Sequence, residues 1–509
     1  MKIKYYFGIV FAALSLASCS ESQLDNINKD EAHSGLDVVN AKFQLTDAEV
    51  STVFNTLCGN YAWYISSYTE QEFGTGNNQL KNVEIRKVAE MAGSTVFNNE
   101  WNSTYSNLFN ITNIRKKCES GVNVGQYDLL GMAETLEALN WGVLTDLHGD
   151  VPFKECFSDI AAPKIDSQKD IYDHVFELLD DALVNFDKGG NKAASQDVIF
   201  GGDLDKWKGL AHALKARYLL HTYGVNRTNT LLNQVLTEAN EAIALWSNCE
   251  QGAILDVFDD NNNNSWFAYA YSRDYVGSST TVDNLLLERD DPREAIYNFD
   301  GYYEAGQIAE PGDEALAGST LSVDLPSFMV NGKAYSHLFS KSELYFIKAE
   351  VQARLGEDAS AAFASAVKAA MEDWQNTGNF VDNIIGIGKI SLTNIDEDAI
   401  DDYVTSLKPR FEANPLKEIF VQKYIAQSRD EQIETYNDIR RCKYVDGDYA
   451  VTLTNPHNTA SGANRWPLRL PYGDSDVVSN PNVAFAFGFG NEAGMYVFTD
   501  PVWWAGGKR

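Results

Sequence analysis

Residues 207–246 read WKGLAHALKARYLLHTYGVNRTNTLLNQVLTEANEAIALW, and their apolar spacing predicts the architecture of the chain. Apolar residues recur every three or four positions in two series: Trp207, Leu210, Leu214 and Tyr218, then Leu232, Val235, Ala239, Ala242 and Trp246. This spacing lines one face of an α-helix. The polar turn NRTN at 226–229 separates the two series, so the stretch predicts a helix hairpin. The small side chains of Ala211, Ala213 and Ala216 allow the two helices to approach closely.

The same helical pattern returns on both sides of this hairpin. It covers residues 129–147 and 171–186 upstream, and residues 340–356 and 415–428 downstream. Ser340 and Glu343 have the spacing of a capping box, and Gly356 stands where a helix would stop. Helix hairpins in series favour tetratricopeptide-like stacking, and therefore a mostly α fold.

Two regions break this pattern. From about 250 to 335 a polar run, Asp259 to Asn264, precedes glycine-rich loops, and the tail from 446 is rich in Pro, Asn and Gly. Long loops on a rigid scaffold commonly carry function. We therefore expect one domain over residues 36–509, with a helical scaffold at about 95–250 and 335–430. The loop-rich binding portion is expected at about 250–335 and 446–509.

The N-terminus has the layout of an export signal. Lys2 and Lys4 precede an apolar run, and Leu16-Ala17-Ser18 lead to Cys19. Small residues before a cysteine resemble a lipobox, so we expect a signal peptide over 1–18, cleavage before Cys19 and a lipid on its thiol. The alternative is an ordinary signal peptide with an accidental cysteine. Residues 19–35 predict a flexible tether, and SESQLD at 20–25 resembles the export tags of lipoproteins on the surface of Bacteroidetes.

The composition excludes several classes of function. The net charge of −31 would repel nucleic acid, whose binding needs clustered Lys and Arg. The five cysteines after Cys19 include no C-x-x-C pair, so we expect mostly buried thiols rather than disulfides or a zinc cluster. Asp256, Asp259 and Asp260 lack the glycine and terminal Glu of an EF-hand, and predict a solvated loop. We expect no metal and no cofactor.

Two aromatic clusters are the candidate ligand-binding residues. Tyr61, Trp63, Tyr64 and Tyr68 precede the glycine loop at 74–78, and Trp266, Tyr269, Tyr271 and Tyr275 follow the asparagine run. Aromatic rings stack on the C–H faces of sugars, while Asn and Asp bind hydroxyls. The site prediction comprises Trp63, Tyr64, Tyr68, Trp266, Tyr269 and Tyr271. The alternative is that these rings belong to the core.

Three further motifs have a structural interpretation. In HGDVPF, residues 148–153, Gly149 is expected to end a helix with positive φ, and Pro152 prevents its continuation. Asp291-Pro292-Arg293 predicts a turn with a buried ion pair. Arg440 and Arg441 are expected to form ion pairs with carboxylates in the core.

Seven segments in order resemble the SusD/RagB family of nutrient-binding outer-membrane lipoproteins. They are WNSTYSNLFNITNIR at 101–115, HGDVPF at 148–153, WKGLAHALKARYLLHTY at 207–223, DPR at 291–293, SELYFIKAEVQARLG at 342–356, QKY at 422–424 with YNDIRR at 436–441, and PLRLPYGDSDVVSNPN at 467–482. His148 departs from the family, which more often has Tyr or Phe before the glycine. Residues 264–275 have no clear counterpart, so no ligand residue is transferred there.

The resemblance implies four tetratricopeptide-like helix pairs and an irregular ligand-binding portion. It implies a lipid-anchored protein on the outside of the outer membrane, acting as the lid of a SusC-like TonB-dependent transporter. The expected ligand is an oligosaccharide, and a peptide is the alternative. No catalysis is expected, although a surface glycosidase, which would need a pair of carboxylates across a cleft, stays open as a less favoured reading.

Overall fold

Helices make up most of the chain in the computed structural model. The structure describes residues 39–75, 79–190, 193–273, 275–298, 324–378, 383–384, 388–389, 395–453 and 465–508. The predicted lipidation site Cys19, the tether and the loop residues 76–78 lie outside the described residues.

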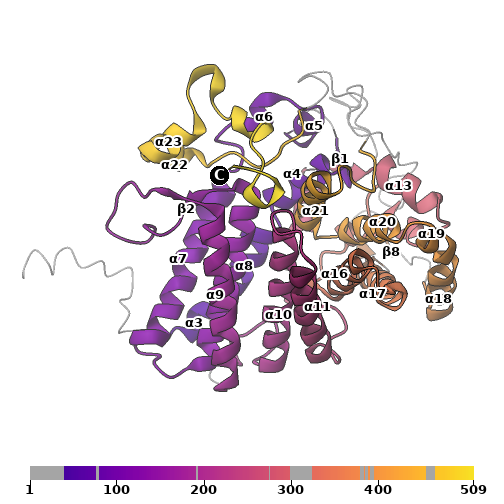
Figure 1. Ribbon diagram of the computed structural model, residues 1–509, viewed down its shortest axis with the longest axis horizontal. Helices are drawn as coiled ribbons and strands as arrows, with labels where there is room; N and C mark the ends of the chain where they lie inside the picture. The colour runs from indigo at the N-terminus through magenta and orange to yellow at the C-terminus, as the bar shows by residue number, and fades with distance from the viewer. Residues whose placement is uncertain are drawn as a thin grey trace, which may run out of the picture.

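Eight long helices form a continuous series in which each helix contacts the next (Figure 1). They are α7 (Asn98–Ser120), α8 (Tyr127–His148), α9 (Gln168–Asp187), α10 (Leu204–Thr222), α11 (Asn229–Leu245), α16 (Lys341–Leu355), α17 (Ser360–Gly378) and α20 (Pro415–Gln427). A series of helices that touch mainly their neighbours is the architecture of a helical repeat. The predicted tetratricopeptide-like helical fold is confirmed.

Shorter elements surround this scaffold. The other helices are α3 (Lys42–Ser51), α4 (Asn60–Tyr68), α5 (Gln79–Glu84), α6 (Val88–Ala92), α12 (Ser265–Arg273), α13 (Thr280–Leu287), α14 (Glu294–Tyr297), α15 (Ser327–Val330), α18 (Glu397–Ser406), α19 (Lys408–Ala413), α21 (Gln432–Val445), α22 (Asp474–Ser479) and α23 (Pro481–Phe487). A π-helical turn (Thr52–Leu57) joins α3 to α4, and three 3₁₀ turns (Gly490–Glu492, Met495–Phe498 and Trp503–Ala505) end the chain.

In the described parts of the chain, the strands pair as short antiparallel ribbons. They are β1 (Glu72–Gly74) with β5 (Val276–Ser278), β2 (Val151–Pro152) with β3 (Ile165–Asp166), β4 (Gly252–Leu255) with β6 (Ser336–Ser340), and β7 (Asn383–Ile384) with β8 (Gly388–Lys389). The first and third ribbons join segments far apart in sequence. Each therefore fixes part of the region between 250 and 335 against the N-terminal half or the scaffold.

The hairpin at 207–246 folds as its sequence predicts. Asp203 and Thr228 cap the two helices, each accepting a hydrogen bond from a backbone N–H of the first turn. All the apolar residues of the two predicted stripes are buried. Gly209 brings α10 close to Trp246, whose indole N–H donates to the Lys206 carbonyl over 3.0 Å. A methyl group at position 209 would lie 2.3 Å from that indole nitrogen.

The capping box before α16 forms only in part. The Ser340 hydroxyl accepts from the Glu343 N–H over 3.0 Å, as predicted. Glu343 does not return to the Ser340 N–H, because its carboxylate binds Arg217. Glu431 takes that role and accepts from the Ser340 N–H over 2.9 Å. At the other end, Gly356 has φ 75° and closes the helix, as expected.

The predictions for the motifs HGDVPF at 148–153 and DPR at 291–293 are confirmed. Gly149 ends α8 with φ 77°, and a side chain there would lie 2.7 Å from the Arg469 guanidinium. Asp291 and Arg293 form the expected ion pair, 2.6 Å long and fully buried. All five described thiols are free, and four of them are buried.

The prediction that Arg440 forms an ion pair with a carboxylate was wrong. Arg441 pairs with the carboxylate of Glu350, with one nitrogen–oxygen distance of 2.8 Å. Arg440 instead donates to the backbone carbonyl of Asp146 over 2.8 Å and lies 3.9 Å from the ring centroid of Tyr436. Oxygen dipoles and an aromatic face thus solvate this buried charge.

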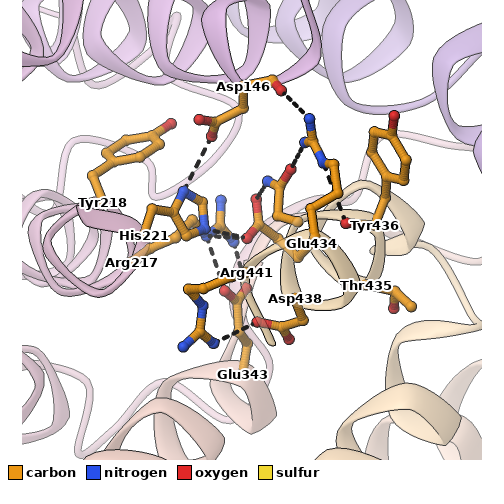
Figure 2. Close-up of polar contacts among 12 residues, drawn as sticks. Asp146, Arg217, Tyr218, His221, Glu343, Glu434, Thr435, Tyr436, Asp438 and Arg441 are labelled. Atoms are coloured by element: carbon orange, nitrogen blue, oxygen red, sulfur yellow. Dashed lines mark hydrogen bonds and ion pairs between the residues drawn. The ribbon is translucent and has the colours of Figure 1, made fainter. Parts of the chain in front are cut away.

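A network of buried charges joins the scaffold helices (Figure 2). Arg217 on α10 binds Glu343 on α16, and its Nε lies 3.7 Å from Glu434 on α21. His221, one turn further along α10, lies 3.1 Å from Glu434 and 3.2 Å from Asp146 on α8. Four helices therefore meet at a few charged atoms from which water is excluded.

The ring of His221 is held in its charged form. Burial lowers the pKa of His221, but the carboxylates of Asp146 and Glu434 outweigh burial and raise it to about 9. Arg217 and His221 together overcome the burial of Glu434 and hold the pKa of its carboxyl well below the usual range. Both ring nitrogens of His221 then donate, and each carboxylate faces a cation. Removing one partner of such a buried pair typically costs about 3–5 kcal/mol.

No helix in the described parts of the chain is long and apolar enough to cross a membrane.

Gly209→Ala tests the close approach within the α10–α11 hairpin. We expect the free energy of unfolding to fall by about 1–3 kcal/mol, because the new methyl group displaces Trp246, even though alanine is the better helix former. Urea denaturation followed by tryptophan fluorescence measures the change. Gln234→Ala, on the exposed face of α11, is the control and should change stability by less than about 0.5 kcal/mol. Equal effects of the two substitutions would contradict the packing.

His221→Gln tests the buried charge network through pH. The pKa of His221 is raised on folding, so its stabilisation is complete below its unfolded pKa near 6.5 and is lost as pH rises through about 9. The difference in unfolding free energy between wild type and variant should therefore shrink by up to about 3 kcal/mol between pH 6.5 and 9.5. Titrating groups away from His221 are common to both proteins and cancel. A difference that stays constant with pH would show that His221 is not charged in the fold.

Candidate functional site

The ribbon of β1 and β5 brings the two predicted aromatic clusters together. Glu72 pairs with Ser278 and Gly74 with Val276, and the ladder continues as the Thr75 N–H donates to the Tyr275 carbonyl over 3.0 Å. β1 follows α4, which carries the first cluster, and β5 follows α12, which carries the second. One short pair of strands thus brings together segments that are about 200 residues apart in the chain.

Trp63 is the point of contact between the clusters. Its ring stacks on Tyr269 with centroids 3.9 Å apart and an interplanar angle of 20°. Trp266 meets the same indole edge-on at 6.5 Å. Trp63 is half-buried, whereas Trp266 and Tyr269 are buried. Trp266 and Tyr269 therefore pack against the ring of Trp63 and hold it in place.

Tyr271 presents the exposed aromatic surface of this region. It is 50% exposed and stacks on Phe267, one turn earlier on α12, with centroids 5.5 Å apart and an angle of only 6°. Tyr269 and Trp266 lie on the other, buried face of the same helix. The helix thus separates the cluster into a supporting face and a face open to solvent, which we call the α12 aromatic face (Phe267 and Tyr271).

Tyr64 and Tyr68 lie in the core. Tyr64 packs edge-on against Phe97 at 5.1 Å, and Tyr68 is fully buried against Tyr436 of α21 at 6.3 Å. Burial raises the pKa of both phenols. In this conformation neither ring is open to a ligand, and their visible role is to fix α4 on the scaffold.

Two open clefts lie apart from these aromatic residues. One, of about 850 Å³, lies between α13 and the pair α19–α20. It is lined by Lys417 and by two arginines, Arg289 and Arg410, which are bound to Glu418 and Glu288. The other, of about 750 Å³, lies between α7, the loop after β2 and α22. None of the six predicted ligand residues lines either cleft.

Asp146, His221 and Glu434 have the atomic spacing of a metal site, since their ligand atoms lie within 4.8 Å of one another. The chemistry of the set does not fit a metal. Both nitrogens of His221 donate to the two carboxylates, and Glu434 also faces Arg217. An additional cation would face a charged imidazole and a guanidinium at close range, so the cluster is an ion-pair network. The polar loop is similarly self-contained, because Asp259 accepts from the N–H groups of Asn261 and Asn262.

Burial raises the pKa of several carboxyl groups, among them Asp476 in the second cleft, but the two whose pKa reaches about 8 are packed in the interior. Burial raises the pKa of Glu134 to about 8, and it accepts two hydrogen bonds from Asn185. Burial raises the pKa of Glu431 to about 8 as well, and its oxygens accept from Ser340. Neither lines one of the two open clefts.

Sequence reasoning missed Phe267 and the cleft beside α7. The signal for Phe267 was present in SWFAYAY, where residues 266 and 269 are three apart and residues 267 and 271 are four apart, as on the two faces of a helix. The region was expected to be loop. The cleft carries no signal in any single segment, because three distant segments form it.

The chain matches the SusD-like_2 family model, described as "Starch-binding associating with outer membrane", over residues 42–472. No curated protein sequence matches it.

Solved structures give the same result. A SusD/RagB family protein from Bacteroides thetaiotaomicron is 34% identical, with a TM-score of 0.82 over 93% of this chain and 100% of that one. A chitin-binding protein superposes with a TM-score of 0.66 at 21% identity, over 92% of this chain and 100% of that one. A chitin-binding SusD homolog from Flavobacterium johnsoniae superposes with a TM-score of 0.60 at 18% identity, over 91% of this chain and 98% of that one.

The family match spans most of the chain, and the match at 34% identity spans nearly all of it. The chain therefore belongs to the SusD/RagB family of glycan-binding proteins associated with the outer membrane.

Proposed function

We propose that this protein is a cell-surface lipoprotein that binds oligosaccharides and delivers them to a TonB-dependent outer-membrane transporter, which it covers as a lid. The observation that carries the glycan assignment is the α12 aromatic face, on the side of α12 opposite the residues that pack on Trp63. A stacked pair of rings, the exposed Tyr271 on the half-buried Phe267, held on a helix, is suited to the apolar face of a sugar. The protein has no catalytic role in this proposal.

The relatives support a glycan over a peptide. The matching family model is described as starch-binding, and two of the superposing structures are described as chitin-binding. Starch and chitin are both neutral polymers of pyranose rings. A chain with a net charge of −31 and an exposed aromatic pair is compatible with a neutral ligand of that kind.

The six predicted ligand residues divide into two roles. Tyr271 and the half-buried Trp63, together with Phe267, would contact the ligand. Trp266 and Tyr269, and more remotely Tyr64 and Tyr68, would hold those rings in place. Such buried support keeps a binding surface preorganised, which lowers the entropy lost on binding.

The membrane arrangement rests on the N-terminal sequence and on the family. LASC at 16–19 would place a lipid on Cys19, and residues 19–35 would leave the folded domain free to move on its tether. Movement relative to a fixed partner is what a lid requires. The transporter itself would be a SusC-like barrel on the outer membrane.

Tyr271→Ala tests the ligand surface. We expect about five- to tenfold weaker binding of malto- or chito-oligosaccharides, which corresponds to about 1–1.4 kcal/mol for the lost ring contact. Isothermal titration calorimetry measures the affinity.

Tyr127→Ala is the matched control, because Tyr127 is a 38%-exposed tyrosine at the start of α8, on a different helix. Its variant should bind as the wild type does. Undiminished binding by Tyr271→Ala would remove the α12 aromatic face from the proposal. Failure of the wild type to bind any glycan, with binding of peptides instead, would overturn the ligand class.

A further inference from the structure

The cleft beside α7 has the size and position of a ligand site. Its volume is about 750 Å³, and it lies between the N-terminal half of α7, the loop from Pro152 to Pro163, and the start of α22. Small-molecule sites typically have volumes of about 300–1,000 Å³. In Figure 1 the three segments meet at one end of the scaffold, beside β2.

One wall of the cleft is aromatic and partly open to solvent. Phe109 is 40% exposed and packs on Phe157 with centroids 5.6 Å apart, while Tyr105 meets the same ring at 6.4 Å. Phe157 has φ 58°, a conformation that bulky residues rarely adopt. Strained backbone of this kind persists where the surrounding structure holds a side chain in a required place. Here it turns a ring toward the cleft.

Beside Tyr105 and Phe109, the same helix supplies uncharged hydrogen-bonding groups at helical spacing. Asn102, Ser106 and Asn110 follow one another every four residues along α7 and so share one face. The Ser475 hydroxyl donates to the Asn102 carbonyl oxygen over 2.6 Å and orients that amide. Within the described residues, the Ser106 hydroxyl and the Asn110 amide make no side-chain hydrogen bond, so they are available to a ligand.

The frame of the cleft is fixed by bonds between its segments. The Trp101 indole donates to Asp476 over 2.7 Å, the Tyr105 hydroxyl to the Pro152 carbonyl over 2.8 Å, and the Asn480 amide to the Pro163 carbonyl over 2.8 Å. Each bond ties α7 or α22 to another segment of the cleft. A preformed site loses less entropy on binding.

The charges of the lining residues restrict the class of ligand that this cleft could bind. Glu155 and Asp476 are the only charged side chains among the lining residues, and neither Lys nor Arg lines the cleft. Phosphates, sulfates and uronic acids would therefore meet acid without a compensating cation. Glu155 itself is 3.5 Å from Lys164 and accepts the Lys164 N–H. The cleft thus suits a neutral ligand with one apolar face and several hydroxyls.

A peptide is less suited to the same surface. An extended peptide is usually recognised through its backbone at the edge of a sheet. The hydrogen-bonding wall here is a helix face, which offers side chains and no free backbone groups. Aromatic rings beside a row of amides and hydroxyls match a pyranose ring, which has apolar C–H faces and hydroxyls at its edge.

We propose that the cleft lined by Tyr105, Phe109, Phe157 and the Asn102–Ser106–Asn110 row is a second binding site for neutral saccharides, separate from the α12 aromatic face. The site shares its ligand class with the proposed function but does not depend on Tyr271. Two sites on one lid would hold a longer chain, or two short chains, with greater avidity.

Cys156 offers a native reporter of occupancy. It lines the cleft and is partly exposed, whereas the other four described thiols are buried. Burial raises the pKa of the Cys156 thiol to about 12, so modification is slow and its rate can be followed. The full lipoprotein in mild detergent is treated with methyl methanethiosulfonate at pH 8.5, with and without maltotriose or triacetylchitotriose. Peptide mass spectrometry then gives the rate at Cys156 alone.

We expect at least one of the two saccharides to slow modification of Cys156 at least threefold in the wild type and in Tyr271→Ala. Phe109→Ala and Asn110→Ala should abolish this protection, and Phe43→Ala, a 63%-exposed phenylalanine on α3, should not. Calorimetry on the same samples reports total saccharide binding, and the part that Tyr271→Ala removes belongs to the α12 aromatic face.

The outcomes separate the two proposals. Calorimetric binding that is weakened by Tyr271→Ala, with Cys156 unprotected in every sample, would overturn the second site and leave the proposed function standing. Protection that survives both Phe109→Ala and Asn110→Ala would also overturn it. Protection of Cys156 by a tryptic peptide mixture, and by neither saccharide, would assign the cleft to polypeptide and contradict the inference.

Discussion

The buried charges that surround Glu434 constrain the rest of the structure. Arg217 and His221 on α10 must reach carboxylates on α8, α16 and α21 at the same time, with no water to screen a misplaced charge (Figure 2). An unpaired charge in such a place is strongly destabilising. The rotation and the axial position of four helices are therefore coupled. Apolar stripes alone would fix the axial positions of the helices less tightly, because a core tolerates one apolar side chain in place of another of similar volume.

The ligand surfaces inherit their rigidity from this scaffold. α4 lies against α21 through Tyr68 and Tyr436, and α4 in turn positions Trp63 beside α12. The cleft beside α7 is anchored at the point where Gly149 ends α8 and the chain turns into β2. The first surface is thus a face of a short helix held on the frame, and the second combines a face of α7 with the connection after β2. The lid proposed here would move as one body.

The sequence predicted the scaffold well and the sites only in part. The helices at 129–147, 171–186 and 207–246 follow from local apolar spacing, and Gly356 and Gly149 end their helices because their backbones adopt positive φ. The stacking of Trp63 on Tyr269 depends on a strand pair that closes some 200 residues, which no local pattern encodes. Arg440 was assigned a carboxylate because the chain is acidic, yet carbonyl oxygens and an aromatic ring surround it. The apolar spacing within 265–273 is that of a helix, although the whole region from about 250 to 335 was expected to be loop-rich.

We propose that this glycan-binding protein delivers its ligand to a transporter in the outer membrane. The most direct test is to solubilise the outer membrane in mild detergent, capture the full-length lipoprotein and identify its partners by mass spectrometry. The account predicts a large TonB-dependent barrel in near-equal amount. Recovery of the protein alone, with the lipid intact on Cys19, would contradict the lid function.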